Sequence, residues 1–284
     1  MTRVGEWRAH ATAELEAAGV DEAALKLEWL LVGVLGWPRW RVQAAAAEPV
    51  PDADLPRLQS ALARLAAREP LQYVLGEADF FGRVFRCDRR ALIPRPETEE
   101  LVARALALAD VWARPAPAVV DVGTGTGCIA ITLALERPAA QVVGIDLDPA
   151  ALSLARENAE WLGRPAGLSW RQADLLEGQP ETSLDLVISN PPYVSASEWQ
   201  DLEPELRDFE PRRALVAGPD GIELLARLAE QAFRALRPGG RLFCEMGSTQ
   251  GIELAAHLRQ LGYSDVVVHN DLAGLPRMVM GVRP

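Results

Sequence analysis

The chain has 284 residues, of which 49% are hydrophobic and 24% charged, values that are ordinary for a globular protein. This length is enough for a small domain beside a medium one. The formal net charge of −11 disfavours a protein that grips a nucleic-acid backbone, because such proteins usually present a basic face. We therefore expect no direct nucleic-acid binding.

The cysteines, Cys87, Cys128 and Cys244, are odd in number and widely spaced. They predict neither a disulfide framework nor a zinc site, and the scattered histidines add no metal cluster. The beginning of the chain reads as an amphipathic helix and lacks the apolar stretch of a signal peptide. The most apolar run, residues 27–37, is too short to cross a bilayer. The sequence thus predicts a cytoplasmic, reduced protein without a metal and without membrane contact.

The first seventy residues carry apolar positions at helical spacing, in two long patterns over residues 25–35 and 55–65. They predict a small helical domain over residues 1–70. Residues 71–95 interleave aromatic residues with glycines, which is typical of a β-hairpin, and we expect a hairpin linker there. Pro94 and Pro96 then precede a helix that we expect to begin near Glu97.

From residue 118 onward the pattern alternates between strand and helix, which predicts a domain over residues 96–284. Such alternation implies an α/β fold, a doubly wound and mostly parallel sheet. The last two strands are close together in sequence, so we expect them to form an antiparallel hairpin. The expected strands are residues 118–122, 141–146, 168–174, 184–190, 241–246, 265–269 and 277–282, and the expected helices are 129–135, 149–162, 221–236 and 250–261.

The first of these strands runs into the glycine-rich turn Gly123-Thr124-Gly125-Thr126-Gly127. Glycines at alternate positions let the backbone turn tightly and approach a ligand closely. Cys128 stands where a dinucleotide-binding turn would have its third glycine, and no phosphate-loop lysine follows. The turn therefore favours a nucleoside ligand without phosphates.

Asp146 ends the next strand, where an acid can accept hydrogen bonds from two ribose hydroxyls. The alternative is an acid that caps the following helix, beside Asp148. Asp174 and Leu175 follow the third strand, where the acid could bind an adenine amino group and the leucine could pack on the ring. The alternative for this pair is an ordinary surface loop.

The strand over residues 184–190 runs into Asn190-Pro191-Pro192-Tyr193, a turn stiffened because two residues precede a proline. In a doubly wound sheet this turn faces the same crevice as the glycine turn. The Asn190 side-chain oxygen and the Pro191 carbonyl could accept both N–H bonds of a planar amide or amino group. That arrangement would place the nitrogen in line with a sulfonium methyl, so that catalysis rests on positioning and electrostatics. The alternative is a proline-rich structural turn.

Longer stretches of the chain resemble a known family. The segments DVGTGTGC, GIDLDPAAL and SNPPY look like those of class I S-adenosylmethionine-dependent methyltransferases. Residues 70–102 are more specific and resemble the release-factor glutamine methyltransferases (the HemK family), as do Glu210-Pro211 and Glu245-Met246-Gly247. The resemblance covers nearly all of residues 70–284, while the helical N-terminal part matches in layout.

The resemblance implies a Rossmann-like, seven-stranded sheet and methylation of the glutamine side chain in the Gly-Gly-Gln motif of peptide chain release factors. It also implies S-adenosylmethionine as cofactor, with S-adenosylhomocysteine as product and no metal. It assigns cofactor binding to Gly123–Gly127 and Asp146 and contact with both cofactor and substrate to Asn190. Pro191, Pro192 and Tyr193 would form the glutamine pocket, which makes them, with Asn190, the expected catalytic residues.

The same resemblance leaves some residues with two interpretations. Many relatives have an aromatic residue where this chain has Leu175, so here an aliphatic side chain would pack on the adenine. Glu97 and Thr98 would shape the pocket entrance or, alternatively, cap a helix.

Three other functions compete with this interpretation. A ribosomal-protein glutamine methyltransferase would use the same chemistry, and the helical domain would decide between the two substrates. An adenine-N6 methyltransferase of DNA or RNA also suits Asn-Pro-Pro-Tyr but needs a basic surface. A cofactor-binding domain without catalysis would not need Asn190.

Overall fold

The computed structural model describes residues 2–284, which divide into two compact units. The first unit comprises the chain up to Glu77 together with Glu203–Phe209, and the second comprises Ala78–Leu202 with Glu210–Pro284. The helices of the first unit are α1 (Val4–Ala17), α2 (Ala23–Leu35), α3 (Arg39–Ala44), α4 (Leu55–Ala66), α5 (Leu71–Leu75) and α10 (Pro204–Phe209).

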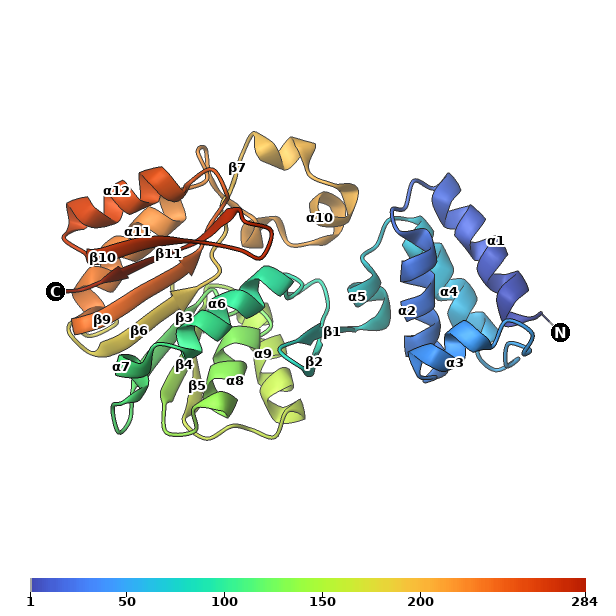
Figure 1. Ribbon diagram of the computed structural model, residues 1–284, viewed down its shortest axis with the longest axis horizontal. Helices are drawn as coiled ribbons and strands as arrows, with labels where there is room; N and C mark the ends of the chain where they lie inside the picture. Colours follow the sequence, from blue (N-terminus) through green and yellow to red (C-terminus); the bar gives the residue numbers. More distant parts are fainter. Residues whose placement is uncertain (1) are drawn as a thin grey trace. The chain divides into compact units, whose positions relative to one another are not determined.

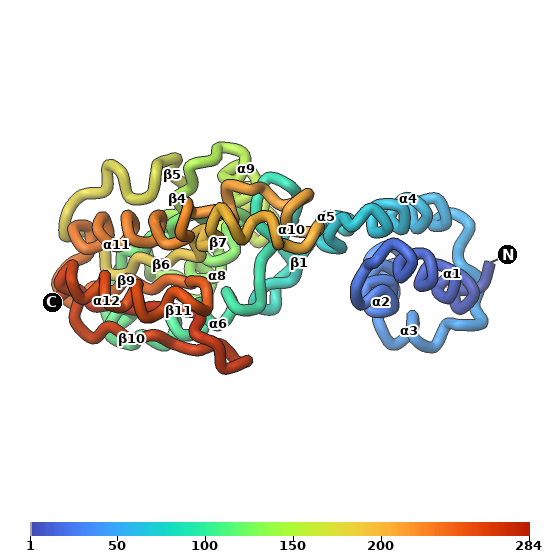
Figure 2. The backbone as a smooth tube through the Cα atoms, turned by 90° about the horizontal axis from the view of Figure 1, so that it is seen from above, coloured from blue at the N-terminus to red at the C-terminus, as the bar shows by residue number. Residues whose placement is uncertain are grey.

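The helices α1, α2 and α4 pack against one another around an apolar core (Figures 1 and 2). The core residues lie at the helical spacing seen in the sequence, with Leu27, Leu30 and Leu31 from α2 fully buried. Leu58 and Leu65 supply the contribution of α4. The prediction of helices in this part of the chain is confirmed.

Within residues 2–284 the second unit contains a seven-stranded sheet of order β10-β11-β9-β6-β3-β4-β5. The strands β3, β4, β5, β6 and β9 run parallel, while β11 is antiparallel to both β9 and β10. The predicted doubly wound sheet with an antiparallel terminal hairpin is therefore confirmed. The bounds are β3 (Ala118–Val122), β4 (Gln141–Asp146), β5 (Leu168–Gln172), β6 (Leu184–Ser189), β9 (Leu236–Glu245), β10 (Ser264–Asn270) and β11 (Pro276–Val282).

Helices cover both faces of this sheet (Figure 1). Alternate residues of each central strand point to opposite faces: Val119 packs with α6 and α8, and Val120 packs with α11 and α12. Both faces of β6 are buried, as expected for a central parallel strand. The helices are α6 (Pro96–Leu106), α7 (Ala109–Trp112), α8 (Cys128–Glu136), α9 (Pro149–Trp161), α11 (Glu223–Ala235) and α12 (Gly251–Leu261).

The linker prediction is partly wrong. Residues 71–75 form the short helix α5, which ends at Gly76 in a left-handed conformation, and only then does the hairpin of β1 (Glu77–Phe80) and β2 (Arg83–Arg86) follow. Pro70 favours the start of a helix, and the apolar side chains of α5 pack on the helical bundle. This packing outweighs the aromatic and glycine content that predicted a β-hairpin over residues 71–75.

The segment between Tyr193 and α11 contains short elements that the sequence did not predict. They are β7 (Val194–Ser195), η1 (Glu198–Asp201), α10, η2 (Arg212–Ala214) and β8 (Val216–Gly218). β7 and β8 pair in parallel as a separate small sheet. These elements lengthen the connection that follows the Asn-Pro-Pro-Tyr turn.

Candidate active site

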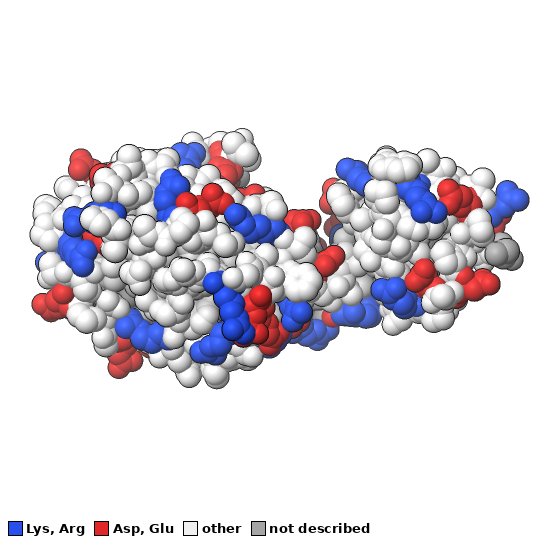
Figure 3. All heavy atoms as spheres, turned by 90° about the horizontal axis from the view of Figure 1, so that it is seen from below, with Lys and Arg blue, Asp and Glu red and all other residues white. Residues whose placement is uncertain are grey.

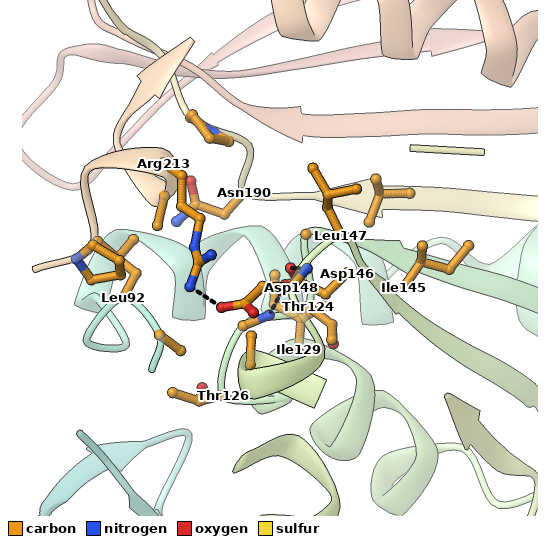
Figure 4. A pocket seen from close by; sticks show the side chains of 18 of the residues that line it. Leu92, Thr124, Thr126, Ile129, Ile145, Asp146, Leu147, Asp148, Asn190 and Arg213 are labelled. Carbon is orange, nitrogen blue, oxygen red and sulfur yellow. Dashed lines mark hydrogen bonds and ion pairs between the residues drawn. The ribbon is translucent and has the colours of Figure 1, made fainter. Parts of the chain in front are cut away.

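A cavity of about 260 Å³ opens at the carboxyl ends of the parallel strands in the second unit (Figure 4). Strand order reverses between β3 and β6, and a doubly wound sheet binds its ligands at such a point. The residues expected in the site that line this cavity are Gly123, Thr124, Gly125, Thr126, Asp146, Asp174, Leu175, Asn190 and Pro192. Gly127, Pro191 and Tyr193 are not among its lining residues.

The glycine turn forms one wall of the cavity. Gly123, Gly125 and Gly127 have φ values of 71°, 54° and 82°, in the left-handed region that favours glycine. A Cβ atom on Gly127 would lie 2.9 Å from the Trp170 ring, whereas one on Gly123 would meet nothing within 4 Å. Gly127 therefore allows close packing behind the turn, and Gly123 leaves its backbone open to a ligand.

Asp121 supports the glycine turn from beneath. Its Oδ2 accepts a hydrogen bond from Thr124 Oγ1 at 2.5 Å and another from the Ala130 backbone N–H at 3.2 Å. Its Oδ1 has no hydrogen-bond partner among residues 2–284. Complete burial raises the pKa of Asp121 to about 7, because a charge is poorly solvated there.

Asp146 braces the same turn from the neighbouring strand. Its Oδ2 accepts from the Gly125 N–H and its Oδ1 from the Asp148 N–H, both at 2.9 Å. Burial raises the pKa of this carboxyl. The helix cap is Asp148, whose Oδ1 accepts from the Ala150 N–H at 2.9 Å, so the alternative role considered for Asp146 belongs to its neighbour.

Asp174 and Leu175 both line the cavity beyond the end of β5. Leu175 is 8% exposed, packs in the core cluster on the face of the sheet that α11 and α12 cover, and has a φ of 52°, an unusual conformation for a leucine. Asp174 is half-exposed, and its Oδ2 accepts from Arg227 at 2.8 Å. The structure thus places an aliphatic side chain and a half-exposed carboxylate at the cavity wall beyond β5, and their contact with an adenine ring stays a prediction.

Asn190 follows directly after β6, whose last residue is tied to β3 by a hydrogen bond from Ser189 Oγ to the Val122 carbonyl at 2.6 Å. The Nδ2 of Asn190 donates to Thr98 Oγ1 at 2.9 Å. Thr98 lies in the first turn of α6 but caps nothing, since its hydroxyl donates to Glu245 instead. The capping interpretation of Thr98 is wrong.

Tyr193 is the last residue of the turn and is not among the residues that line the cavity. Its hydroxyl donates to Glu245 Oε1 at 3.3 Å, and burial raises the pKa of the phenol well above its ordinary value. The carbonyl of Tyr193 accepts from Gln250 Nε2 at 2.9 Å. The turn is therefore held by side chains from both β9 and the start of α12.

Two ion pairs near the cavity were missed by the sequence analysis. Arg213 points at Asp148, and both side chains line the cavity (Figure 4). Arg95 pairs with the buried carboxylate of Glu210, which also accepts from the Ile93 N–H at 3.1 Å. Glu210 entered the sequence analysis only through the family resemblance. No local pattern could indicate its ion pair, because Arg95 and Glu210 lie 115 residues apart in sequence.

Two further properties concern the whole described chain. Over residues 2–284 no three histidine, cysteine or acidic side chains gather as a metal site would require. None of the helices in this range combines the length and the apolar character needed to cross a membrane.

Comparisons with known proteins show which family the chain belongs to. The PrmC N-terminal domain model matches residues 6–76, and the methyltransferase small domain model matches residues 102–203. The release factor glutamine methyltransferase of Cereibacter sphaeroides is 43% identical over 96% of both chains. The enzyme of the same name from Geobacter sulfurreducens is 38% identical over 94% of this chain and 92% of its own.

Solved structures support the fold alone. The catalytic domain of hMettl16, in complex with an RNA hairpin, aligns with a TM-score of 0.57 over 82% of each chain at 15% identity. At that identity the likeness confirms the class I methyltransferase fold and says nothing about the substrate. By its full-length identity to curated relatives, the chain belongs to the release factor glutamine methyltransferase family.

Proposed function

We propose that this protein methylates the side-chain amide nitrogen of the glutamine in the Gly-Gly-Gln motif of peptide chain release factors, with S-adenosylmethionine as methyl donor. One observation carries the proposal: Asn190, at the end of β6, lines the same cavity as the glycine turn. This arrangement would set a hydrogen-bond acceptor for a planar nitrogen next to the proposed nucleoside site.

The residues of the cavity fit S-adenosylmethionine. The glycine turn offers an open backbone, and the Asp146 carboxylate suits ribose hydroxyls but would repel a phosphate. Leu175 and Asp174 would hold the adenine. When bound, S-adenosylmethionine supplies a methyl group on a positively charged sulfur.

The turn after β6 would hold the acceptor amide. The Asn190 Oδ1 and the Pro191 carbonyl would accept the two N–H bonds of the glutamine side chain and fix its plane. In the reaction the nitrogen would gain the methyl group as the bond between that methyl and sulfur breaks, and one N–H proton would pass to solvent water. The two neutral acceptors polarise the N–H bonds and so favour that loss. Pro191 and Pro192 keep the turn rigid, and Tyr193, with its phenol neutral, supports it from behind.

A protein substrate fits the surface of the molecule better than a nucleic acid does. On the face seen in Figure 3, arginines are interspersed with acidic side chains and do not gather into a basic stripe. The formal net charge of −11 opposes the binding of a phosphate backbone. We propose that the helical unit contacts the release factor away from the glutamine, so that a short Gly-Gly-Gln peptide is methylated poorly.

The test is to incubate the protein with methyl-labelled S-adenosylmethionine and an unmethylated release factor, beside the factor whose motif is changed to Gly-Gly-Ala. We expect label on the first and none on the second. An Asn190→Ala variant should lower kcat by roughly 10²- to 10³-fold, as expected for loss of one pre-positioned polar group. Label on a ribosomal protein or on DNA, with none on the release factor, would refute the proposed substrate.

A further inference from the structure

A chain of hydrogen bonds runs beneath the Asn-Pro-Pro-Tyr turn. Asn190 Nδ2 donates to Thr98 Oγ1 at 2.9 Å, and Thr98 Oγ1 donates to Glu245 Oε2 at 2.7 Å. The other carboxyl oxygen of Glu245 accepts from the Tyr193 hydroxyl at 3.3 Å. Thr98 and Glu245 are 2% and 1% exposed, so water does not replace these partners.

The fold brings these residues together from three elements. Ser189 pairs with Cys244 between β6 and β9, which places Asn190 and Glu245 side by side at the ends of the two strands. Thr98 reaches them from the first turn of α6. Glu245 does not line the cavity, so it acts on the site only through its neighbours.

The direction of each hydrogen bond follows from the carboxylate. An ionised carboxylate can only accept, so the Thr98 hydroxyl must donate to it. A hydroxyl has a single proton, and Thr98 Oγ1 can then only accept from Asn190. The amide of Asn190 must therefore present Nδ2 to Thr98, which leaves Oδ1 as the atom that can accept a hydrogen bond from a ligand in the cavity.

We propose that Thr98 and Glu245 are positioning residues that set the orientation of the Asn190 amide, so that its oxygen and not its nitrogen meets the glutamine substrate. The inference rests on the proposed function. Without this fixed direction the Asn190 amide could turn by half a rotation and present two donors to a substrate nitrogen that is itself a donor.

The charge on Glu245 is set by its surroundings. Burial raises its pKa to about 7, opposed by the Thr98 hydrogen bond and by the nearby Arg277 on β11. Glu97 on α6 raises the pKa further, and the Tyr193 hydroxyl lowers it. A protonated Glu245 can donate as well as accept and no longer dictates the Asn190 orientation. We therefore expect kcat to fall as pH drops from 8 to 6.

Three variants separate positioning from simple support. Thr98→Val has nearly the same shape but no hydroxyl, while Thr98→Ser restores the hydroxyl. Glu245→Gln keeps the size of the side chain but has one acceptor oxygen and one amino group, so it cannot accept from both Thr98 and Tyr193. Circular dichroism and S-adenosylmethionine affinity verify that each variant is folded and binds the cofactor.

The first readout is steady-state kinetics on the release factor. We expect Thr98→Val and Glu245→Gln to lower kcat by about 10- to 100-fold with KM little changed, since a misplaced group costs rate more than binding. Thr98→Ser should recover most of the rate, and the decline of kcat toward pH 6 should disappear in Glu245→Gln. Equal kcat values for Thr98→Val and Thr98→Ser would overturn the proposal.

The second readout does not depend on turnover. The side-chain amide protons of Asn190, followed by nuclear magnetic resonance, should exchange slowly in the wild type and in Thr98→Ser. They should exchange quickly in Thr98→Val and Glu245→Gln. Slow exchange in all four proteins would refute the positioning role even if none of them methylates a release factor, whereas an inactive wild type with the expected exchange pattern would refute only the proposed function.

Discussion

The buried Asp121 carboxyl allows a sharp test of the physics beneath the glycine turn, through the variant Asp121→Asn. Both hydrogen bonds of Asp121 are accepted by Oδ2, and the asparagine oxygen can accept both in its place. The new amino group then occupies the position of Oδ1, which has no partner within residues 2–284. We expect this unpaired group to cost about 1–3 kcal/mol at every pH.

The wild type carries a cost that depends on pH. The pKa of Asp121 rises from 3.8 to about 7 on folding, because burial penalises the charge. Below pH 4 the Asp121 carboxyl is protonated in both the folded and the unfolded protein. Between pH 4 and 7 it is protonated only in the folded protein, so the free energy of unfolding falls as pH rises. Above pH 7 it is ionised in both, and the fall levels off. A difference of about three pKa units corresponds to a loss of roughly 4 kcal/mol in the free energy of unfolding. Roughly 3 kcal/mol of that loss occurs between pH 5 and pH 8.

The assay is urea denaturation of both proteins at pH 5 and pH 8, followed by circular dichroism. Asp121→Asn should be less stable than the wild type at pH 5. Because only the wild type loses stability between pH 5 and pH 8, the difference in free energy of unfolding should shift by about 3 kcal/mol in favour of the variant by pH 8. The control is Asp88→Asn. A hydrogen bond from Arg90 lowers the pKa of Asp88, so this carboxyl is ionised at both pH 5 and pH 8. The loss of stability in Asp88→Asn should therefore be the same at both pH values. A stability difference for Asp121→Asn that does not change with pH would refute the reasoning.

The remaining predictions concern the two units separately. In thermal or urea unfolding, Gly127→Ala should lose about 1–3 kcal/mol more free energy of unfolding than Gly123→Ala. The reason is that only the Gly127 variant places a Cβ against the Trp170 ring. Asp146→Asn keeps one acceptor oxygen for two backbone N–H groups, so calorimetry should show the S-adenosylmethionine Kd rise about tenfold. Arg68→Ala removes the pairs of Arg68 Nη2 with Glu203 at 3.2 Å and Glu205 at 2.6 Å, so limited proteolysis should cut residues 203–209 sooner.

The strands of the sheet could be predicted because each carries its own local signal. Residues 118–122 and 141–146 were predicted with the bounds that β3 and β4 have, since buried parallel strands are short apolar runs ended by glycine or acid. β9 begins at Leu236 and not at Arg241, because it continues through a glycine pair beside an irregular register with β6. The sequence analysis left residues 237–240 outside any element, whereas the structure includes them in β9.

The contacts of the candidate site were less accessible from sequence. The glycine turn, Asp146 and Asn190 follow strand ends, and topology alone brings strand ends to one edge. The bond between Thr98 and Glu245 joins residues 147 apart, and nothing local distinguishes Thr98 from a helix cap. Asp148 illustrates the same difficulty, since two acids two residues apart divide the roles of turn support and helix cap between them.

The two turns that face the cavity are built alike. Under the glycine turn the Asp121 carboxyl accepts from Thr124, and under the Asn-Pro-Pro-Tyr turn the Glu245 carboxyl accepts from Thr98. Burial raises the pKa of both acids to about 7, so each weakens the fold near neutral pH. Apolar residues of the same size would avoid that cost but could not impose a direction on a hydroxyl. If the proposed function holds, the two carboxyls fix the direction of these hydrogen bonds before the ligands arrive. For Asn190, that direction would determine whether its oxygen can accept a hydrogen bond from the substrate amide.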